Sequence, residues 1–260
     1  MVCYLDYLFL HKKSYSVLNT HKSMLLQTLP FFGNTWCSQT FLIQKFMKGC
    51  FHSKPPVPRY KFTWDVSIVL RFLKTLSPLH SLTLKLLTFK TIALIALATA
   101  PRAQTLVSMN LRNMLREQQA VVFTFPNLLK TTRVGGAYTL QIEHFEDESL
   151  CAMHTLLYYL KKTKGLRKSN QVFVSYVTFC AITSSTIARW LRSVLDLAGI
   201  DTQYFKAHSF RGASASAAAS GGCKLQNILK TADWRTDKNF KKFYLRKPVH
   251  DISFYKAVFS

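Results

Sequence analysis

Six residues of this sequence belong to side-chain types that together suffice for phosphoryl transfer. They are Arg102, Lys130, His208, Arg211, Trp234 and Tyr244. Two arginines suit one phosphate, because their planar and permanently charged guanidinium groups bind its oxygens bidentately. Such a clamp stabilises the negative charge that spreads over these oxygens in the transition state.

The remaining side chains supply a nucleophile and proton transfer. A tyrosine hydroxyl can attack phosphorus and form a covalent bond. A histidine can take the tyrosine's proton, and a lysine can protonate the departing sugar oxygen. This chemistry requires no metal, and the six candidate residues include no Asp or Glu. We therefore expect neither a metal nor a cofactor.

Each of these residues also has an ordinary structural explanation. Arg102 follows a strongly apolar stretch, where a cation would suit a helix C-terminus. Lys130 would be a solvated hairpin lysine, and Trp234 and Tyr244 would be packing residues. His208 and Arg211 lie one helical turn apart at the start of an Ala- and Ser-rich run, "HSFRGASASAAAS", whose small face lets a helix lie close to a neighbour. The order of the six residues, more than any single one, favours a site.

The elements that must position these residues follow from hydrophobic spacing. We expect a fold that is mainly α with a small antiparallel β-sheet, an α+β architecture. The first expected helices cover most of residues 14–54. Further helices are expected over residues 63–76, where Thr63 is the cap, and over residues 81–100, 149–167 and 183–200. The expected strands are residues 119–125 and 137–145, joined by a turn that contains Gly135 and Gly136.

Three prolines, Pro55, Pro56 and Pro58, interrupt the helical pattern and favour an extended linker. We therefore predict a helical domain over residues 1–54, a linker over 55–60 and a larger domain over 61–260.

The charge of the chain points to a polyanionic partner. Thirty-five Lys and Arg residues against 12 Asp and Glu give a net charge of +23. With 48% hydrophobic residues the chain can bury a core, which excludes a disordered basic tail. Nucleic acid is the commonest partner of such a protein. Nonspecific affinity and acidic lipid are the alternatives.

The six scattered cysteines form no C-x-x-C pair and predict reduced, mostly buried thiols of an intracellular protein. The most apolar window, "TIALIALATAP", has about half the length of a membrane span and predicts a buried helix. The N-terminus is a poor signal peptide. We expect no membrane partner and no small-molecule ligand.

Several stretches that contain the six candidate residues resemble the tyrosine recombinase (phage integrase) family, and most closely the recombinases of DIRS-like retrotransposons. The resemblance covers the chain from about Ser14 to Val249 and includes "LATAPRAQTL", "LLKTTR", "KAHSFRGASASAAASGG" and "ILKTADWRTDKNFKKFYLRKPV". It implies a recombinase catalytic fold over residues 61–260, preceded by a helical core-binding (SAM-like) domain. This first domain is short, and we expect it to be truncated.

The resemblance also implies a role for each residue of the set. Arg102 and Arg211 match the arginine clamp, His208 the proton acceptor and Lys130 the proton donor to the leaving oxygen. Trp234 matches a position where the family has histidine or tryptophan near the phosphate, and Tyr244 matches the nucleophile.

The sequence departs from the family pattern at Thr105, where many members carry an acid that supports the first arginine. DIRS-like relatives share the "R-x-Q-T-L" pattern that contains this threonine. In the family the chain after the nucleophile often docks on a neighbouring protomer, and "HDISFYKAVFS" is expected to do so.

The function that this resemblance implies is site-specific recombination in the nucleus. Strands of double-stranded DNA would be cut and rejoined through a 3′-phosphotyrosine link, by a homotetramer on two DNA sites. Two alternatives remain at this point. One is a catalytically inactive or domesticated DNA-binding remnant, and the other is relaxation of a single duplex, as in type IB topoisomerases.

Overall fold

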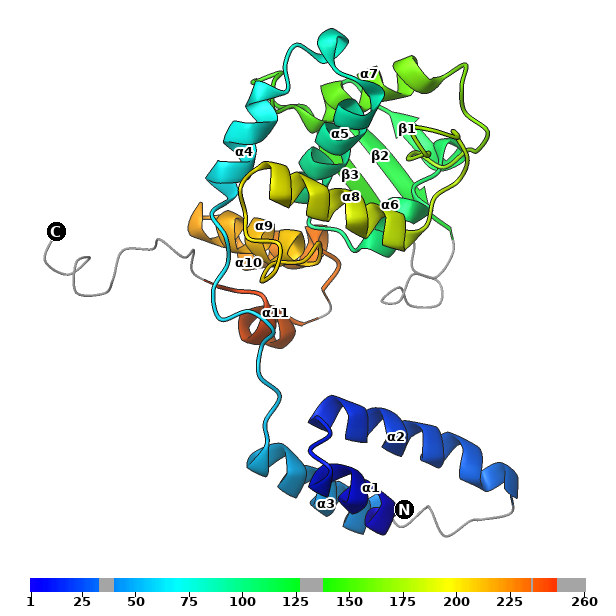
Figure 1. Ribbon diagram of the computed structural model, residues 1–260, viewed down its shortest axis with the longest axis vertical. Coiled ribbons are helices and arrows are strands. Elements are labelled where there is room, and N and C mark those ends of the chain that lie inside the picture. Colours follow the sequence, from blue (N-terminus) through cyan, green and yellow to red (C-terminus); the bar gives the residue numbers. More distant parts are fainter. Residues whose placement is uncertain (33–39, 127–137, 235, 247–260) are drawn as a thin grey trace, which may run out of the picture. The chain divides into compact units, whose positions relative to one another are not determined.

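The computed structural model describes residues 1–32, 40–126, 138–234 and 236–246. The chain divides into two compact units, Met1–Arg59 and Tyr60–Ser260 (Figure 1). Within the described ranges, no helix is both long and apolar enough to span a membrane.

The smaller unit is helical and has its own core. Its elements are α1 (Val2–Leu10), α2 (Tyr15–Thr28), a 3-10 turn η1 (Leu29–Phe32) and α3 (Thr40–Ser53). Buried residues of all three α-helices, including Leu5, Leu18 and Met47, pack together. Ser14 caps α2 by accepting a hydrogen bond from the backbone N–H of Val17. Helix α1 was not expected, because no side chain caps its start.

The larger unit combines helices with one small sheet, which confirms the expected fold class. Its elements are α4 (Val66–Thr75), η3 (Leu79–Ser81), α5 (Leu84–Thr99), α6 (Ala103–Ser108), η4 (Leu111–Asn113), β1 (Met114–Arg116), β2 (Ala120–Phe125), β3 (Tyr138–Glu143), α7 (Ala152–Thr163), α8 (Ser184–Leu197), α9 (Ser209–Ser220), α10 (Leu225–Thr231) and α11 (Asp237–Phe243).

Helix α5 is the central element of this unit. Thr83 caps it, its side chain accepting a hydrogen bond from the Leu86 N–H. Because apolar residues cover every face, α5 is buried and contacts α7, α8, α9 and β3 (Figure 1). The helix ends at Ala100, which adopts a left-handed conformation with φ 43° and is followed by Pro101. This end is where the candidate site begins.

The sheet is antiparallel with the strand order β1-β2-β3. Strands β2 and β3 pair from Ala120 with Glu143 to Phe125 with Tyr138. Alternate side chains such as Phe123 are buried in the core. Strand β1 was not expected, because three residues are too short to show an alternating pattern.

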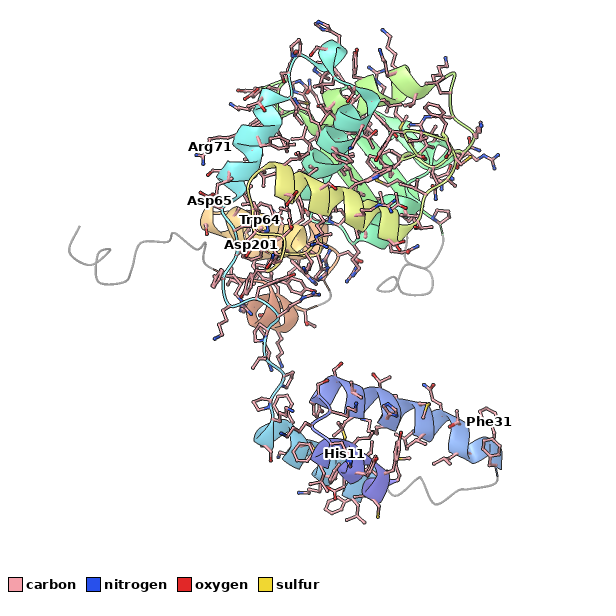
Figure 2. The ribbon with its side chains drawn as sticks, viewed as in Figure 1. His11, Phe31, Trp64, Asp65, Arg71 and Asp201 are labelled. Carbon is pink, nitrogen blue, oxygen red and sulfur yellow. The ribbon has the colours of Figure 1, made fainter. Side chains whose placement is uncertain are left out.

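One helix cap differs from the expectation. Helix α4 is capped by Asp65 rather than Thr63, since the Asp65 carboxylate accepts hydrogen bonds from both the N–H and the hydroxyl of Ser67. Figure 2 labels Asp65 beside Trp64, whose indole N–H donates to Ser209 Oγ of α9 at 2.8 Å.

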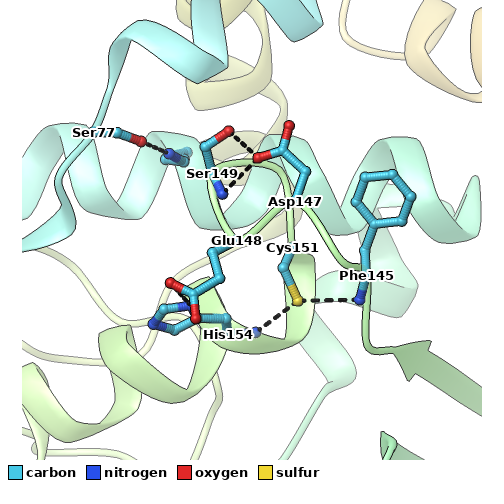
Figure 3. A network of polar contacts seen from close by, with 8 residues as sticks. Ser77, Phe145, Asp147, Glu148, Ser149, Cys151 and His154 are labelled. Carbon is cyan, nitrogen blue, oxygen red and sulfur yellow. Dashed lines mark hydrogen bonds and ion pairs between the residues drawn. The ribbon is translucent and has the colours of Figure 1, made fainter.

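The expectation of mostly buried thiols is wrong for the described cysteines. Cys50 and Cys151 are buried, whereas Cys3, Cys180 and Cys223 are exposed, because they lie on an outward helix face or in connecting segments. Buried Cys151 has a structural role. Its sulfur accepts hydrogen bonds from the N–H groups of His154 and Phe145, which caps α7 (Figure 3).

Candidate active site

Helix α9 carries two of the six candidate residues and lies close to α5. Its Ala- and Ser-rich face removes bulk between the two helices, and Ser214 Oγ donates a hydrogen bond to the Leu97 carbonyl of α5. His208 is the N-cap residue of α9, and Arg211 lies in the first turn. The positive end of the helix dipole therefore faces the region of these two side chains.

Arg211 is buried, with 2% of its surface exposed, and is only partly hydrogen-bonded. Its Nη1 donates to the Ala100 carbonyl at 2.6 Å. The left-handed conformation of Ala100 after α5 directs this carbonyl toward the guanidinium. Its Nη2 has no hydrogen-bond partner among the described residues. Burial, together with the nearby charge of Arg102, lowers the pKa of Arg211 to about 10. The side chain thus stays charged at neutral pH and presents a buried donor that an anion would satisfy.

Tyr244 lies directly after α11, with its hydroxyl against His208. Tyr244 Oη and His208 Nε2 are 3.0 Å apart, and the two rings meet edge to face. The backbone of this segment is tied to α9, because Ser216 Oγ donates to the Tyr244 carbonyl and accepts from the Arg246 N–H. A hydroxyl that could act as a nucleophile and an imidazole that could act as a base are therefore within proton-transfer distance.

Trp234 packs between the arginine and the tyrosine. The Arg211 guanidinium carbon lies 4.2 Å from the centroid of the Trp234 ring, which is the distance of a cation–π contact. The Trp234 and Tyr244 rings lie 4.8 Å apart. The indole thus orients the guanidinium and supports the tyrosine ring.

Arg102 comes from the turn between α5 and α6 and pairs with an acid that the sequence analysis missed. Its Nη1 lies 2.9 Å from Asp233 Oδ2, and its Nη2 lies 3.4 Å from the Asp233 carbonyl oxygen. The signal in the sequence was the position of Asp233 directly before Trp234. Thr105, at the position where the resemblance led us to expect an acid, is buried in α6.

Tyr138, at the start of β3, is a second residue near the site that the sequence analysis missed. Its hydroxyl donates to the Thr231 carbonyl at the end of α10. Burial and the charge of Asp233 raise its pKa to about 12, while Arg211 and Arg102 act in the opposite direction. Tyr138 is therefore neutral near the arginine pair, and no local motif distinguished it.

The structure brings five of the six candidate residues together, from segments separated by more than one hundred positions. They are Arg102, His208, Arg211, Trp234 and Tyr244. Lys130 lies outside the described residues. The assembled groups provide two guanidinium cations, one of which has a buried N–H without a partner among the described residues, and a tyrosine hydroxyl in contact with a histidine. Groups of these types can carry out attack on a phosphodiester.

No protein-family model matches the sequence, and no curated protein matches it. Solved structures do. A XerA recombinase aligns with a TM-score of 0.55 and 14% identity over 99% of this chain and 87% of that chain. The Tn1549 transposon integrase in complex with circular intermediate DNA aligns with a TM-score of 0.55 and 13% identity, over 99% of this chain and 82% of that chain.

XerH site-specific recombinase bound to its difH substrate aligns with a TM-score of 0.54 and 12% identity over 71% of this chain. The match spans about half of XerH, 49% of its length. The chain therefore has the fold of the tyrosine recombinases, as its motifs predicted.

Proposed function

We propose that this protein cleaves and rejoins DNA strands with Tyr244 as the nucleophile. The observation that carries the proposal is the 3.0 Å contact between Tyr244 Oη and His208 Nε2, beside a buried arginine with an unsatisfied N–H.

In the proposed reaction, Tyr244 Oη attacks the scissile phosphorus while its proton passes to His208. The bond between phosphorus and the 5′ oxygen breaks, and the leaving oxygen takes a proton, which we assign to Lys130. The product is a 3′-phosphotyrosine link and a free 5′-hydroxyl. Attack by the 5′-hydroxyl of a second strand then releases the tyrosine and rejoins the DNA. Arg102 and Arg211 stabilise the charge that develops on the phosphate oxygens.

Double-stranded DNA is the proposed partner. The net charge of +23 favours a polyanion, and the fold is that of proteins solved on DNA, such as XerH on difH and the Tn1549 integrase. We further propose that four copies act on two DNA sites in the nucleus, and that the protein serves integration of a mobile element. The last point depends on the likeness of its motifs to DIRS-like recombinases.

A nicked suicide substrate tests this proposal, because loss of a short fragment after cleavage traps the covalent intermediate. Wild-type protein and Tyr244→Phe are incubated with a pool of nicked random duplexes and separated on a denaturing gel. We expect a band shifted by the mass of the DNA for wild type only, with DNA binding retained in the variant. Binding without any adduct in the wild type would instead favour a non-catalytic DNA-binding protein.

A further inference from the structure

We infer that Asp233 is a positioning residue that holds the Arg102 guanidinium in the orientation needed to bind the scissile phosphate. This inference rests on the proposed function. It assigns a role to an acid that lies 131 residues from its partner in the sequence.

Asp233 contacts Arg102 through two different oxygens. The carboxylate Oδ2 accepts from Nη1 at 2.9 Å, and the backbone carbonyl lies 3.4 Å from Nη2. Two contacts to the planar guanidinium restrict both its position and the direction of its plane. The side chains are 26% and 20% exposed for Arg102 and Asp233, so the pair is partly shielded from water.

The backbone of Asp233 is in the left-handed region, with φ 52°. Its N–H donates to the Lys230 carbonyl, and the N–H of Trp234 donates to the Leu229 carbonyl, so this turn ends α10. Residues other than glycine adopt such a conformation only at a cost in free energy, although Asp and Asn tolerate it better than most. Glycine would make the turn at lower cost, but it would bring no carboxylate to Arg102.

The same turn serves both arginines. Asp233 contacts Arg102, and the next residue, Trp234, stacks on Arg211. The two guanidinium groups are close enough that the charge of Arg102 disfavours the charged form of Arg211. A carboxylate at this point offsets that repulsion before the phosphate binds.

Two substitutions separate the carboxylate from the backbone conformation. Asp233→Asn keeps a residue that tolerates φ 52° and removes the negative charge. Asp233→Gly removes the whole side chain and relieves the backbone, so we expect this variant to melt no lower than the wild type. Single-turnover cleavage of the suicide substrate is measured at saturating DNA, and DNA affinity is measured separately. Arg102→Ala and the double variant Arg102→Ala with Asp233→Asn complete a double-mutant cycle.

We expect each Asp233 variant to slow cleavage on the order of 100-fold, the cost of a misplaced catalytic group, with DNA affinity nearly unchanged. In the Arg102→Ala background, Asp233→Asn should cause no further slowing, because its effect passes through the arginine. Wild-type rates in both variants, or slowing that adds to that of Arg102→Ala, would overturn the inference. A wild type that forms no Tyr244-dependent adduct would instead overturn the proposed function.

Discussion

At the scale of single residues, Arg211 gives the strongest support for an anion-binding site. A buried cation with an unsatisfied N–H is costly, and a fold retains it only when a ligand or a partner compensates. The Ala100 carbonyl and the Trp234 ring fix the guanidinium but leave Nη2 without a partner among the described residues. A phosphate oxygen fits this requirement.

Replacement of Arg211 by lysine tests whether the guanidinium shape matters beyond its charge. Lysine keeps a positive charge but cannot hold the Ala100 carbonyl and a phosphate at once in a planar fork. We expect Arg211→Lys to slow strand cleavage by roughly 100- to 1,000-fold, the range for loss of a transition-state donor, with a much smaller loss of DNA affinity.

The control is Arg71→Lys, a change in an exposed arginine of α4 that Figure 2 labels. It should leave the cleavage rate unchanged. Equal losses of rate and affinity in Arg211→Lys would reduce this residue to a phosphate contact that positions DNA.

At the scale of elements, α9 organises the site. One face packs on α5, its first turn supplies Arg211, and Ser216 holds the segment that carries Tyr244, the proposed nucleophile. The Ala and Ser residues of the run thus have two uses, close helix packing and hydrogen bonds to the backbone of other segments.

Ser216→Ala should loosen Tyr244 without altering any group that contacts phosphate. One hydroxyl donates to the Tyr244 carbonyl at 2.9 Å and accepts from the Arg246 N–H at 3.0 Å, so its loss frees two backbone groups. We expect cleavage to slow by roughly tenfold or more, because the nucleophile is less well placed. Ser220→Ala, at the exposed end of the same helix, should cleave at the wild-type rate. Equal rates for the two variants would contradict the role of Ser216.

Helix α5 contains a fully buried lysine, which predicts a specific dependence of stability on pH. Lys90 Nζ donates to the Leu76 carbonyl and to Ser77 Oγ; Ser77 is labelled in Figure 3. Burial lowers the pKa of Lys90 to about 8, while the charge of Asp147 opposes this shift. Between about pH 8 and pH 10.5 the unfolded chain binds a proton that the folded protein has lost. Lys90 therefore makes the free energy of unfolding rise with pH in this window, by at most about 1.4 kcal/mol per pH unit.

Urea unfolding of the wild type and of Lys90→Met across this window measures the effect. Relative to the variant, the wild type should gain stability from pH 8 to pH 10.5 and show no relative change below pH 7. Lys85→Met, at an exposed position of the same helix, should parallel the wild type. If the free energies of unfolding of wild type and Lys90→Met differ by the same amount at every pH, the lowered pKa of Lys90 is disproved.

The sequence predicted the elements with long periodic patterns, and it singled out the five candidate residues that lie together in the structure. Helices α5 and α8 and strands β2 and β3 follow from repeated hydrophobic spacing and clear caps. Strand β1 is too short to show a period, and α1 lacks a capping side chain. Tyr138 was missed because its contact with a distant segment leaves no local pattern. Asp233 directly precedes Trp234, but its importance comes from a pairing with Arg102 across 131 positions.

At the scale of the whole molecule, charge should control DNA affinity. With a net charge of +23, binding is expected to release many counterions from the phosphate backbone. If the protein covers about 6–10 phosphates, the dissociation constant should rise roughly 1,000-fold or more between 50 and 200 mM salt. Fluorescence anisotropy with a duplex of mixed sequence measures this slope. An affinity that is independent of salt would contradict DNA as the partner.

The products formed from plasmid DNA distinguish recombination from relaxation. We expect exchange between two DNA sites to require an assembly of several copies. Relaxation of a single supercoiled plasmid by the monomer would indicate topoisomerase-like activity instead.

The central claim is that Tyr244 forms a covalent bond with DNA, and mass spectrometry of the trapped adduct tests it most directly. The adduct is digested with nuclease and trypsin, which releases the peptide Phe243–Arg246 between Lys242 and Lys247. We predict that this peptide carries the added mass of a nucleotide joined through its phosphate to the single tyrosine, and that no such peptide arises from Tyr244→Phe. A nucleotide attached to any other residue would contradict the assignment of the nucleophile.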